Sequence, residues 1–87
     1  EDHIGEEFVG MISTITNFGF FVELDNMIEG LVRITDLNGY YNYLEESQIL
    51  IDEKTHNMYK LGDKVLVKVV RASKEEKEID FEIIKKI

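Results

Sequence analysis

The residues best suited to chemistry lie in one stretch, positions 17–24, which reads Asn-Phe-Gly-Phe-Phe-Val-Glu-Leu. Aromatic rings exposed on a sheet can stack on flat ligands, and nucleobases are the commonest such ligands. Because side chains alternate across a strand, at least one of these rings should face solvent. Gly19 predicts a bulge or a close backbone approach, which would turn Phe18 and Phe21 to one outer face and leave Phe20 inside. The alternative is an aromatic-rich strand of the core.

The other reactive side chains form no catalytic or metal-binding pattern. The 18 Asp and Glu residues are scattered over predicted polar faces and loops, unlike the grouped carboxylates of a two-metal nuclease. His3 and His56 lack a plausible nucleophile or further ligands, and no serine sits in a nucleophile elbow. The absence of cysteine excludes disulfides and thiolate zinc sites. We therefore expect no catalytic residue, no metal site and no cofactor.

The net charge of −8 argues against a strongly basic nucleic-acid binder, because counterion release needs Lys and Arg near phosphates. A local patch can nevertheless oppose the charge of the whole surface. The basic residues gather from Lys54 onward, and Arg33 stands apart from them.

A length of 87 residues predicts one small domain, covering residues 1–87. The chain begins with neither an initiator methionine nor a signal peptide, so we expect a piece of a longer protein. No run of 18 apolar residues predicts a transmembrane helix. The lack of cysteine fits a reducing compartment, and we expect a cytoplasmic location.

Alternating apolar and polar residues predict five short strands. The strands are expected at residues 5–13, 17–24, 28–35, 65–71 and 78–84. Residues 14–17 and Asp25-Asn26 read as turns, the second of them a tight hairpin turn. The side chains expected to point inward are Phe20, Val22, Leu24, Val32, Ile34, Val65, Val67, Val69, Ile79, Phe81 and Ile83. Those expected to point outward are Arg33, Lys64, Lys68, Glu78, Asp80 and Glu82, with Arg71 less certain by the same alternation.

The segment from residue 38 to residue 61 interrupts this alternation and is rich in tyrosine. We interpret it as an irregular insertion with a small hairpin, and a helix over residues 41–48 is the competing interpretation. The tyrosines at 40, 41, 43 and 59 are expected to build a satellite core under the insertion, because a long loop needs something to bury.

Five short strands with a longer excursion between the third and the fourth predict an all-β fold, a five-stranded antiparallel OB-fold barrel with a tyrosine-rich insertion. Such barrels bind oligonucleotides on the face of strands two and three, flanked by the loops that join strands one to two and four to five. This plan should bring Asn17, Phe18, Phe21 and Arg33 close to the loop at residues 73–77.

A family resemblance rests on three motifs, at residues 10–24, 28–37 and 62–65. The first contains Phe18-Gly19-Phe20-Phe21-Val22, the second reads Ile-Glu-Gly-Leu-Val-Arg-Ile-Thr-Asp-Leu, and the third Gly-Asp-Lys-Val. Together they resemble the S1 RNA-binding domain over nearly the whole chain. A more specific similarity is to the S1 domain of bacterial ribonuclease R, which belongs to the ribonuclease II family of 3′-to-5′ exoribonucleases. It rests on the tyrosine-rich segment, on Tyr59 to Asp63 and on residues 79–82.

The resemblance implies roles at matching positions. The family's two exposed aromatics fall on Phe18 and Phe21, and a position that is often histidine falls on Arg33. The family's loop acid falls on Ser73, and its following basic residue falls on Lys77 or, with an offset of one, on Glu78. Arginine in place of histidine should still bind phosphate or stack, whereas serine in place of an acid removes an orienting partner.

The predicted function is single-stranded RNA binding, holding substrate for a ribonuclease R-like exoribonuclease. The chain has no proline, so the catalytic motif of the ribonuclease II family, which begins Asn-Pro, is absent. We therefore expect that the fragment is not an enzyme. Its parent should be a hydrolytic 3′-to-5′ exoribonuclease. Expected partners are single-stranded RNA and the parent's catalytic domain, with no membrane, and the fragment should be monomeric. The predicted RNA-binding residues are Phe18, Phe21, Arg33, Lys77, Asn17, Ser73 and Lys68, with Lys74 as a further candidate.

Two other interpretations stay open. The chain could be an S1 repeat of a translation or transcription factor, against which the tyrosine-rich insertion argues. It could also be a protein-interaction OB module whose phenylalanine face docks a partner, which the acidic charge favours. Lys64 and Lys68 fit equally well as a solvated face or as an RNA contact.

Overall fold

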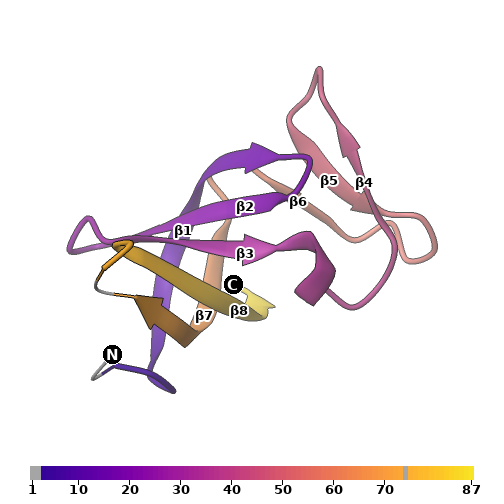
Figure 1. The fold of residues 1–87 in the computed structure, drawn as a ribbon. Helices are drawn as coiled ribbons and strands as arrows, with labels where there is room; N and C mark the ends of the chain where they lie inside the picture. Colours follow the sequence, from indigo (N-terminus) through magenta and orange to yellow (C-terminus); the bar gives the residue numbers. More distant parts are fainter. Residues whose placement is uncertain (1–2, 74) are drawn as a thin grey trace.

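The computed structural model describes residues 3–73 and 75–87, whose regular elements are all strands apart from one 3₁₀ turn (Figure 1). Their elements are β1 (Glu7–Thr16), β2 (Gly19–Leu24), β3 (Glu29–Arg33), the 3₁₀ turn η1 (Ile34–Asp36), β4 (Tyr41–Leu44), β5 (Ile49–Asp52), β6 (Met58–Lys60), β7 (Lys64–Ser73) and β8 (Glu78–Lys86). The all-β prediction is therefore confirmed. No helix in this described part of the chain is long and apolar enough to cross a membrane.

Five strands close into a barrel in the order β1-β2-β3-β8-β7 (Figure 1). All neighbours pair antiparallel except β3 and β8, which meet in parallel at Leu31 and Asp80 and so close the barrel. Closure removes the open edges that a small sheet would expose. The predicted OB-fold barrel is confirmed, with one parallel contact in it.

The barrel core contains the side chains that alternation directed inward. Phe20, Val22, Val32, Val65 and Val67 have no exposed surface. Phe81 is also buried, and Gly30 makes room for it, because a Cβ at position 30 would lie 2.6 Å from the Phe81 ring. Ile79 and Ile83 are partly buried and pack against this core.

The insertion is more regular than the sequence predicted. Strands β4, β5 and β6 form a separate three-stranded antiparallel sheet, so the insertion contains the predicted small hairpin as part of a regular sheet, and the competing helix over residues 41–48 is wrong. Asp52 ties this sheet together, since its carboxylate accepts hydrogen bonds from Tyr40 N at 2.8 Å, Thr55 N at 2.8 Å and Thr55 Oγ1 at 2.6 Å. The nearly buried Asp52 carboxylate thus fixes the turn between β5 and β6 and ties it to Tyr40, just before β4.

The tyrosines do not build a satellite core. Tyr59 and Leu50 belong to the same buried cluster as the barrel residues, and the Tyr59 ring lies 5.0 Å from that of Phe20. Tyr41 and Tyr43 pack against this cluster, whereas Tyr40 is 67% exposed. The small sheet is therefore docked on the barrel through aromatic contacts.

Several predicted strand ends and one turn differ in the structure, because they depend on hydrogen bonds that alternation cannot reveal. Strand β1 continues to Thr16, so residues 14–16 are strand and not turn. Strand β3 ends at Arg33, and Ile34, predicted in the strand, lies in the 3₁₀ turn. In the β2–β3 hairpin the left-handed residue is Met27 (φ 68°), while Asn26 Oδ1 accepts a hydrogen bond from Ile28 N at 3.1 Å.

Candidate nucleic-acid interface

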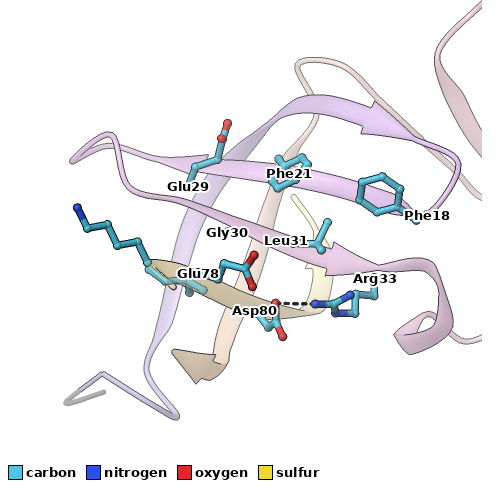
Figure 2. Close-up of a pocket in the computed structure, with 10 residues that line it drawn as sticks. Phe18, Phe21, Glu29, Gly30, Leu31, Arg33, Glu78 and Asp80 are labelled. Atoms are coloured by element: carbon cyan, nitrogen blue, oxygen red, sulfur yellow. Dashed lines mark ion pairs between the residues drawn. The ribbon is translucent and has the colours of Figure 1, made fainter. Parts of the chain in front are cut away.

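A groove of about 440 Å³ runs along the outer face of the barrel between β2, β3 and the start of β8 (Figure 2). Its lining consists of two aromatic rings, an aliphatic floor, two cations and three carboxylates. These residues are Phe18, Phe21, Glu29, Gly30, Leu31, Arg33, Lys77, Glu78, Ile79 and Asp80. The β2–β3 face and the β7–β8 connection thus meet at one site, as the OB-fold plan predicts.

The two predicted platform rings lie together on this face. The centroids of Phe18 and Phe21 are 6.4 Å apart, and the rings are perpendicular, a favourable edge-to-face arrangement. Phe18 is 49% exposed and Phe21 is half-buried, while Phe20 between them is in the core. Both rings therefore present open surface beside Leu31 (Figure 2).

The geometry at Gly19 explains how Phe18 reaches the outer face. Phe18 lies in the turn before β2, so strand alternation does not govern its direction. Gly19 has φ 151°, and a Cβ there would lie 2.1 Å from the carbonyl oxygen of Val32. The predicted close approach is confirmed, but the bulge is on the neighbouring strand, between Ile12 and Thr14.

Hydrogen bonds hold the turn that carries Phe18. Phe18 N donates to Thr16 Oγ1 at 3.2 Å, and Ile34 N donates to the Phe18 carbonyl oxygen at 2.8 Å. Thr16 Oγ1 in turn donates to the Gly19 carbonyl oxygen at 3.1 Å. The ring is thus attached to a backbone fixed from both sides.

The two cations lie toward opposite ends of the groove. Arg33 ends β3, whereas Lys77 directly precedes β8. Because β3 and β8 run parallel with Leu31 opposite Asp80, the start of β8 lies beside the start of β3, far from Arg33. The spacing allows contacts with phosphates on both sides of the aromatic pair.

Acidic side chains also line the groove, so it is not a strongly basic patch. Glu29, Glu78 and Asp80 stand against Arg33 and Lys77. Glu29 accepts a hydrogen bond from Ser13 Oγ at 2.6 Å. Binding of a polyanion here must therefore depend on stacking and on individually placed cations.

The structure does not place every predicted residue in the groove. Asn17 is exposed in the turn beside Phe18 but does not line the groove. Ser73 lines a smaller neighbouring hollow, where its Oγ accepts a hydrogen bond from Glu76 N at 3.2 Å. Lys68 is on β7 opposite Glu7 and Glu82, away from the groove lining. Lys74 lies outside the described residues.

Asp80 is the main residue that the sequence did not reveal. Alternation directed it outward to solvent, yet it is only 8% exposed. Arg33 Nη2 approaches Asp80 Oδ1 at 3.6 Å (Figure 2), and Arg71 Nη1 approaches Asp80 Oδ2 at 3.1 Å. Arg33 on β3 thus pairs with an acid on β8. The signal that sequence reasoning lacked is the parallel contact between β3 and β8, which joins distant segments.

Two further lining residues, Glu29 and Leu31, could have been found from the sequence. Glu29 and Leu31 share the parity of Arg33 on β3, so alternation places all three on one face.

Among residues 3–73 and 75–87, no group of three or more His, Asp or Glu side chains is placed to hold a metal ion.

Comparison with known proteins assigns the chain to a family. The model of the S1 RNA binding domain matches residues 1–84. The chain belongs to this family. This S1 domain is 47% identical over 85 residues to ribonuclease R 1 of Lactococcus lactis, a match that covers 97% of the chain and 10% of the relative.

Solved structures agree with this assignment. The apo form of Mycoplasma genitalium RNase R matches with a TM-score of 0.90 and 33% identity, over 95% of this chain and 13% of that one. The same enzyme in complex with ribose methylated single-stranded RNA matches with a TM-score of 0.89, 33% identity and the same coverage. The S1 domain therefore spans only about a tenth of the length of these relatives.

Proposed function

We propose that this S1 domain binds single-stranded RNA along the groove. Phe18 and Phe21 stack on successive bases, while Arg33 and Lys77 contact the phosphates on either side. The observation that carries the proposal is the exposed, perpendicular pair of rings beside an arginine on the β2–β3 face. The likeness to an RNase R solved with single-stranded RNA supports it.

The chemistry of these side chains predicts how the RNA is recognised. Stacking contributes about 1–3 kcal/mol per base and tolerates every base, so sequence preference should be slight. The planar guanidinium of Arg33 can keep its contact with Asp80 and still present N–H donors to a phosphate. The three carboxylates of the lining oppose general attraction of the backbone, so affinity of the domain alone should be weak.

The same RNA-binding site could serve a longer protein of which this domain forms one part. We propose that the domain holds substrate for a hydrolytic, ribonuclease R-like 3′-to-5′ exoribonuclease, and contributes binding but not catalysis. Identities of 41–47% to ribonuclease R proteins from several bacteria support this parent over a translation or transcription factor. A weak module is useful there, because modules linked on one RNA bind together far more tightly than each does alone.

The test is titration with a short oligouridine, followed by backbone NMR shifts and by anisotropy at two salt concentrations. The double variant Phe18→Ala with Phe21→Ala should lose at least about tenfold in affinity, since two stacking platforms are removed. Tyr40→Ala is the matched control, because it removes an exposed ring outside the groove. Unchanged binding of the double variant, or shifts confined to β4–β6, would contradict the proposal.

A protein-interaction module is the second candidate, and the acidic lining favours it. In that case oligouridine would cause no shifts at Phe18, Phe21 and Arg33. The RNA titration therefore decides between the two functions.

A further inference from the structure

A second hollow of about 150 Å³ adjoins the groove where β7 meets β8. It is lined by Arg33, Arg71, Ser73, Glu76, Glu78 and Asp80. Three of these, Arg33, Glu78 and Asp80, also line the main groove. The outer surface is thus hollowed continuously from β2 across β3 and β8 to β7.

Asp80 connects the two hollows. It lies opposite Leu31 on β3 and opposite Arg71 on β7, so its carboxylate stands between both neighbouring strands. Each oxygen receives one guanidinium, at 3.6 Å from Arg33 and at 3.1 Å from Arg71. These are the two arginines of the chain, and a single nearly buried acid holds both.

A bulge in β7 turns Arg71 outward. Val65, Val67 and Val69 are buried, so strict alternation would direct residue 71 into the core. The register between β7 and β8 shifts between Val69 and Arg71. Bulges re-aim side chains in this way, and the Arg71 side chain is 74% exposed as a result.

We propose that Arg71 is a further phosphate-binding residue of this domain, positioned together with Arg33 by Asp80. The RNA backbone then continues from the aromatic pair past Arg33 and over β8 to Arg71. This inference rests on the proposed RNA-binding function and extends its site by one strand.

The Arg33–Asp80–Arg71 group has the charge and the donors that a phosphate needs. Two guanidinium groups on one carboxylate leave a net positive charge, so Asp80 orients the arginines without cancelling them. A guanidinium has five N–H donors in a rigid fork, and contact with Asp80 leaves donors free for a phosphate. Because the side chains are already ordered, less conformational entropy is lost on binding. Glu76 and Glu78 on the same hollow make binding depend on those oriented donors.

The first test compares Arg71→Gln with Lys54→Gln on oligouridines of about four and about twelve nucleotides, the range that one OB-fold covers. Both variants change the net charge equally, but Lys54 lies over the Tyr40 ring outside both hollows. Arg71→Gln should weaken binding of the longer strand roughly three- to tenfold, as expected for one charge-assisted contact, and leave the shorter strand unchanged. The salt dependence, plotted as log K against log salt, should become shallower by about 0.7 for one lost phosphate contact.

The outcomes separate this inference from the proposed function. If Arg71→Gln binds the longer strand like Lys54→Gln while the Phe18 and Phe21 double variant loses binding, Arg71 is not a contact and the inference is wrong. If the double variant keeps full affinity, the RNA-binding function itself fails.

Asp80→Asn tests the positioning role by the sign of its effect. The change removes one negative charge from the domain. If Asp80 only repelled phosphates, its replacement would therefore tighten binding of oligouridine. Positioning predicts weaker binding of the longer strand despite the gained charge, and tighter binding would overturn it. If this variant fails to fold, the Nε–H resonances of the two arginines in the unaltered domain provide the test. Both should shift with the longer oligouridine, and an unshifted Arg71 would contradict the inference.

Discussion

Gly19 determines the direction of the Phe18 ring, which lies three positions before Phe21 in the sequence. Positions i and i+3 on a regular strand face opposite sides, so Phe18 and Phe21 could not form one platform within β2. The backbone at Gly19, with φ 151° and almost in contact with the Val32 carbonyl oxygen, places Phe18 in the preceding turn. Gly19 is thus a condition for the proposed stacking site, although it lines no part of the groove itself.

Gly19→Ala should destabilise the domain more than Gly62→Ala. Both glycines have positive φ, which costs another residue about 1–3 kcal/mol, but only Gly19 has backbone atoms where a Cβ would lie. A Cβ at Gly62 meets nothing within 4 Å, so this variant isolates the cost of the dihedral angle. Urea unfolding measures the difference in free energy of unfolding. Equal losses in the two variants would show that the clash at Val32 is relieved.

The small sheet of β4, β5 and β6 stands outside the barrel but shares its core through Tyr59 (Figure 1). Burial, reinforced by the neighbouring Tyr41, raises the pKa of Tyr59 to about 12, so its phenol stays neutral in the folded protein at ordinary pH. Lys86 at the end of β8 donates to the Met58 carbonyl oxygen at 2.6 Å and so joins β6 to the last strand of the barrel. Aromatic packing and the last strand of the barrel together fix the sheet.

Acid should loosen this sheet through Asp52. Hydrogen bonds from the Thr55 side chain, then from the Thr55 and Tyr40 backbones, lower the pKa of Asp52 to about 2. A lowered pKa in the folded state means that the ionised carboxylate stabilises the fold above its ordinary pKa near 4, and that this stability is lost as pH falls toward about 2. The protection factors of the Tyr40 and Thr55 amides, which correct for the intrinsic exchange rate, should fall as the pH is lowered from 6 to 3.

Asp52→Asn should show fast exchange at both amides already at pH 6, with little further acid-dependent loss of protection. Asp25→Asn, on the exposed β2–β3 turn, is the control and should retain the acid dependence. An acid response of the sheet that is the same with and without Asp52 would assign it to another group.

The whole molecule is acidic, with a net charge of −8, and places its groove cations singly among carboxylates. Such a surface produces no extended positive electrostatic potential that would attract a polyanion. In the proposed function, base stacking must therefore supply much of the affinity for RNA. This explains how an acidic domain can belong to a family of RNA-binding domains. The proposed role, as one of several contacts on an RNA strand, fits such a surface.

The 87-residue domain alone should bind a twelve-nucleotide oligouridine with a Kd on the order of tens of micromolar or weaker. The logarithm of affinity should fall with the logarithm of salt with a slope of roughly −2, for phosphate contacts at Arg33, Lys77 and Arg71 at about 0.7 each. Fluorescence anisotropy across a salt series measures both quantities. Nanomolar affinity, or affinity independent of salt, would contradict this balance of stacking and charge.

Local patterns in the sequence determined most of the barrel. Alternation is a property of neighbouring residues, so it correctly directed Phe20, Val22 and Val67 inward and Arg33 outward. The spacing of the five predicted strands, with one long excursion, was enough for the OB-fold. The same parity also placed Leu31 and Glu29 on the face that lines the groove.

Only the tertiary structure decided how distant segments meet. The junction of Arg33, Asp80 and Arg71 depends on a parallel contact that closes the barrel and on a bulge in β7, neither of which has a local signature. The regular β4–β6 sheet depends likewise on the hydrogen bonds that Asp52 makes across a turn. Side-chain alternation is determined residue by residue, whereas strand closure, bulges and buried charges are determined by packing between segments far apart in the chain.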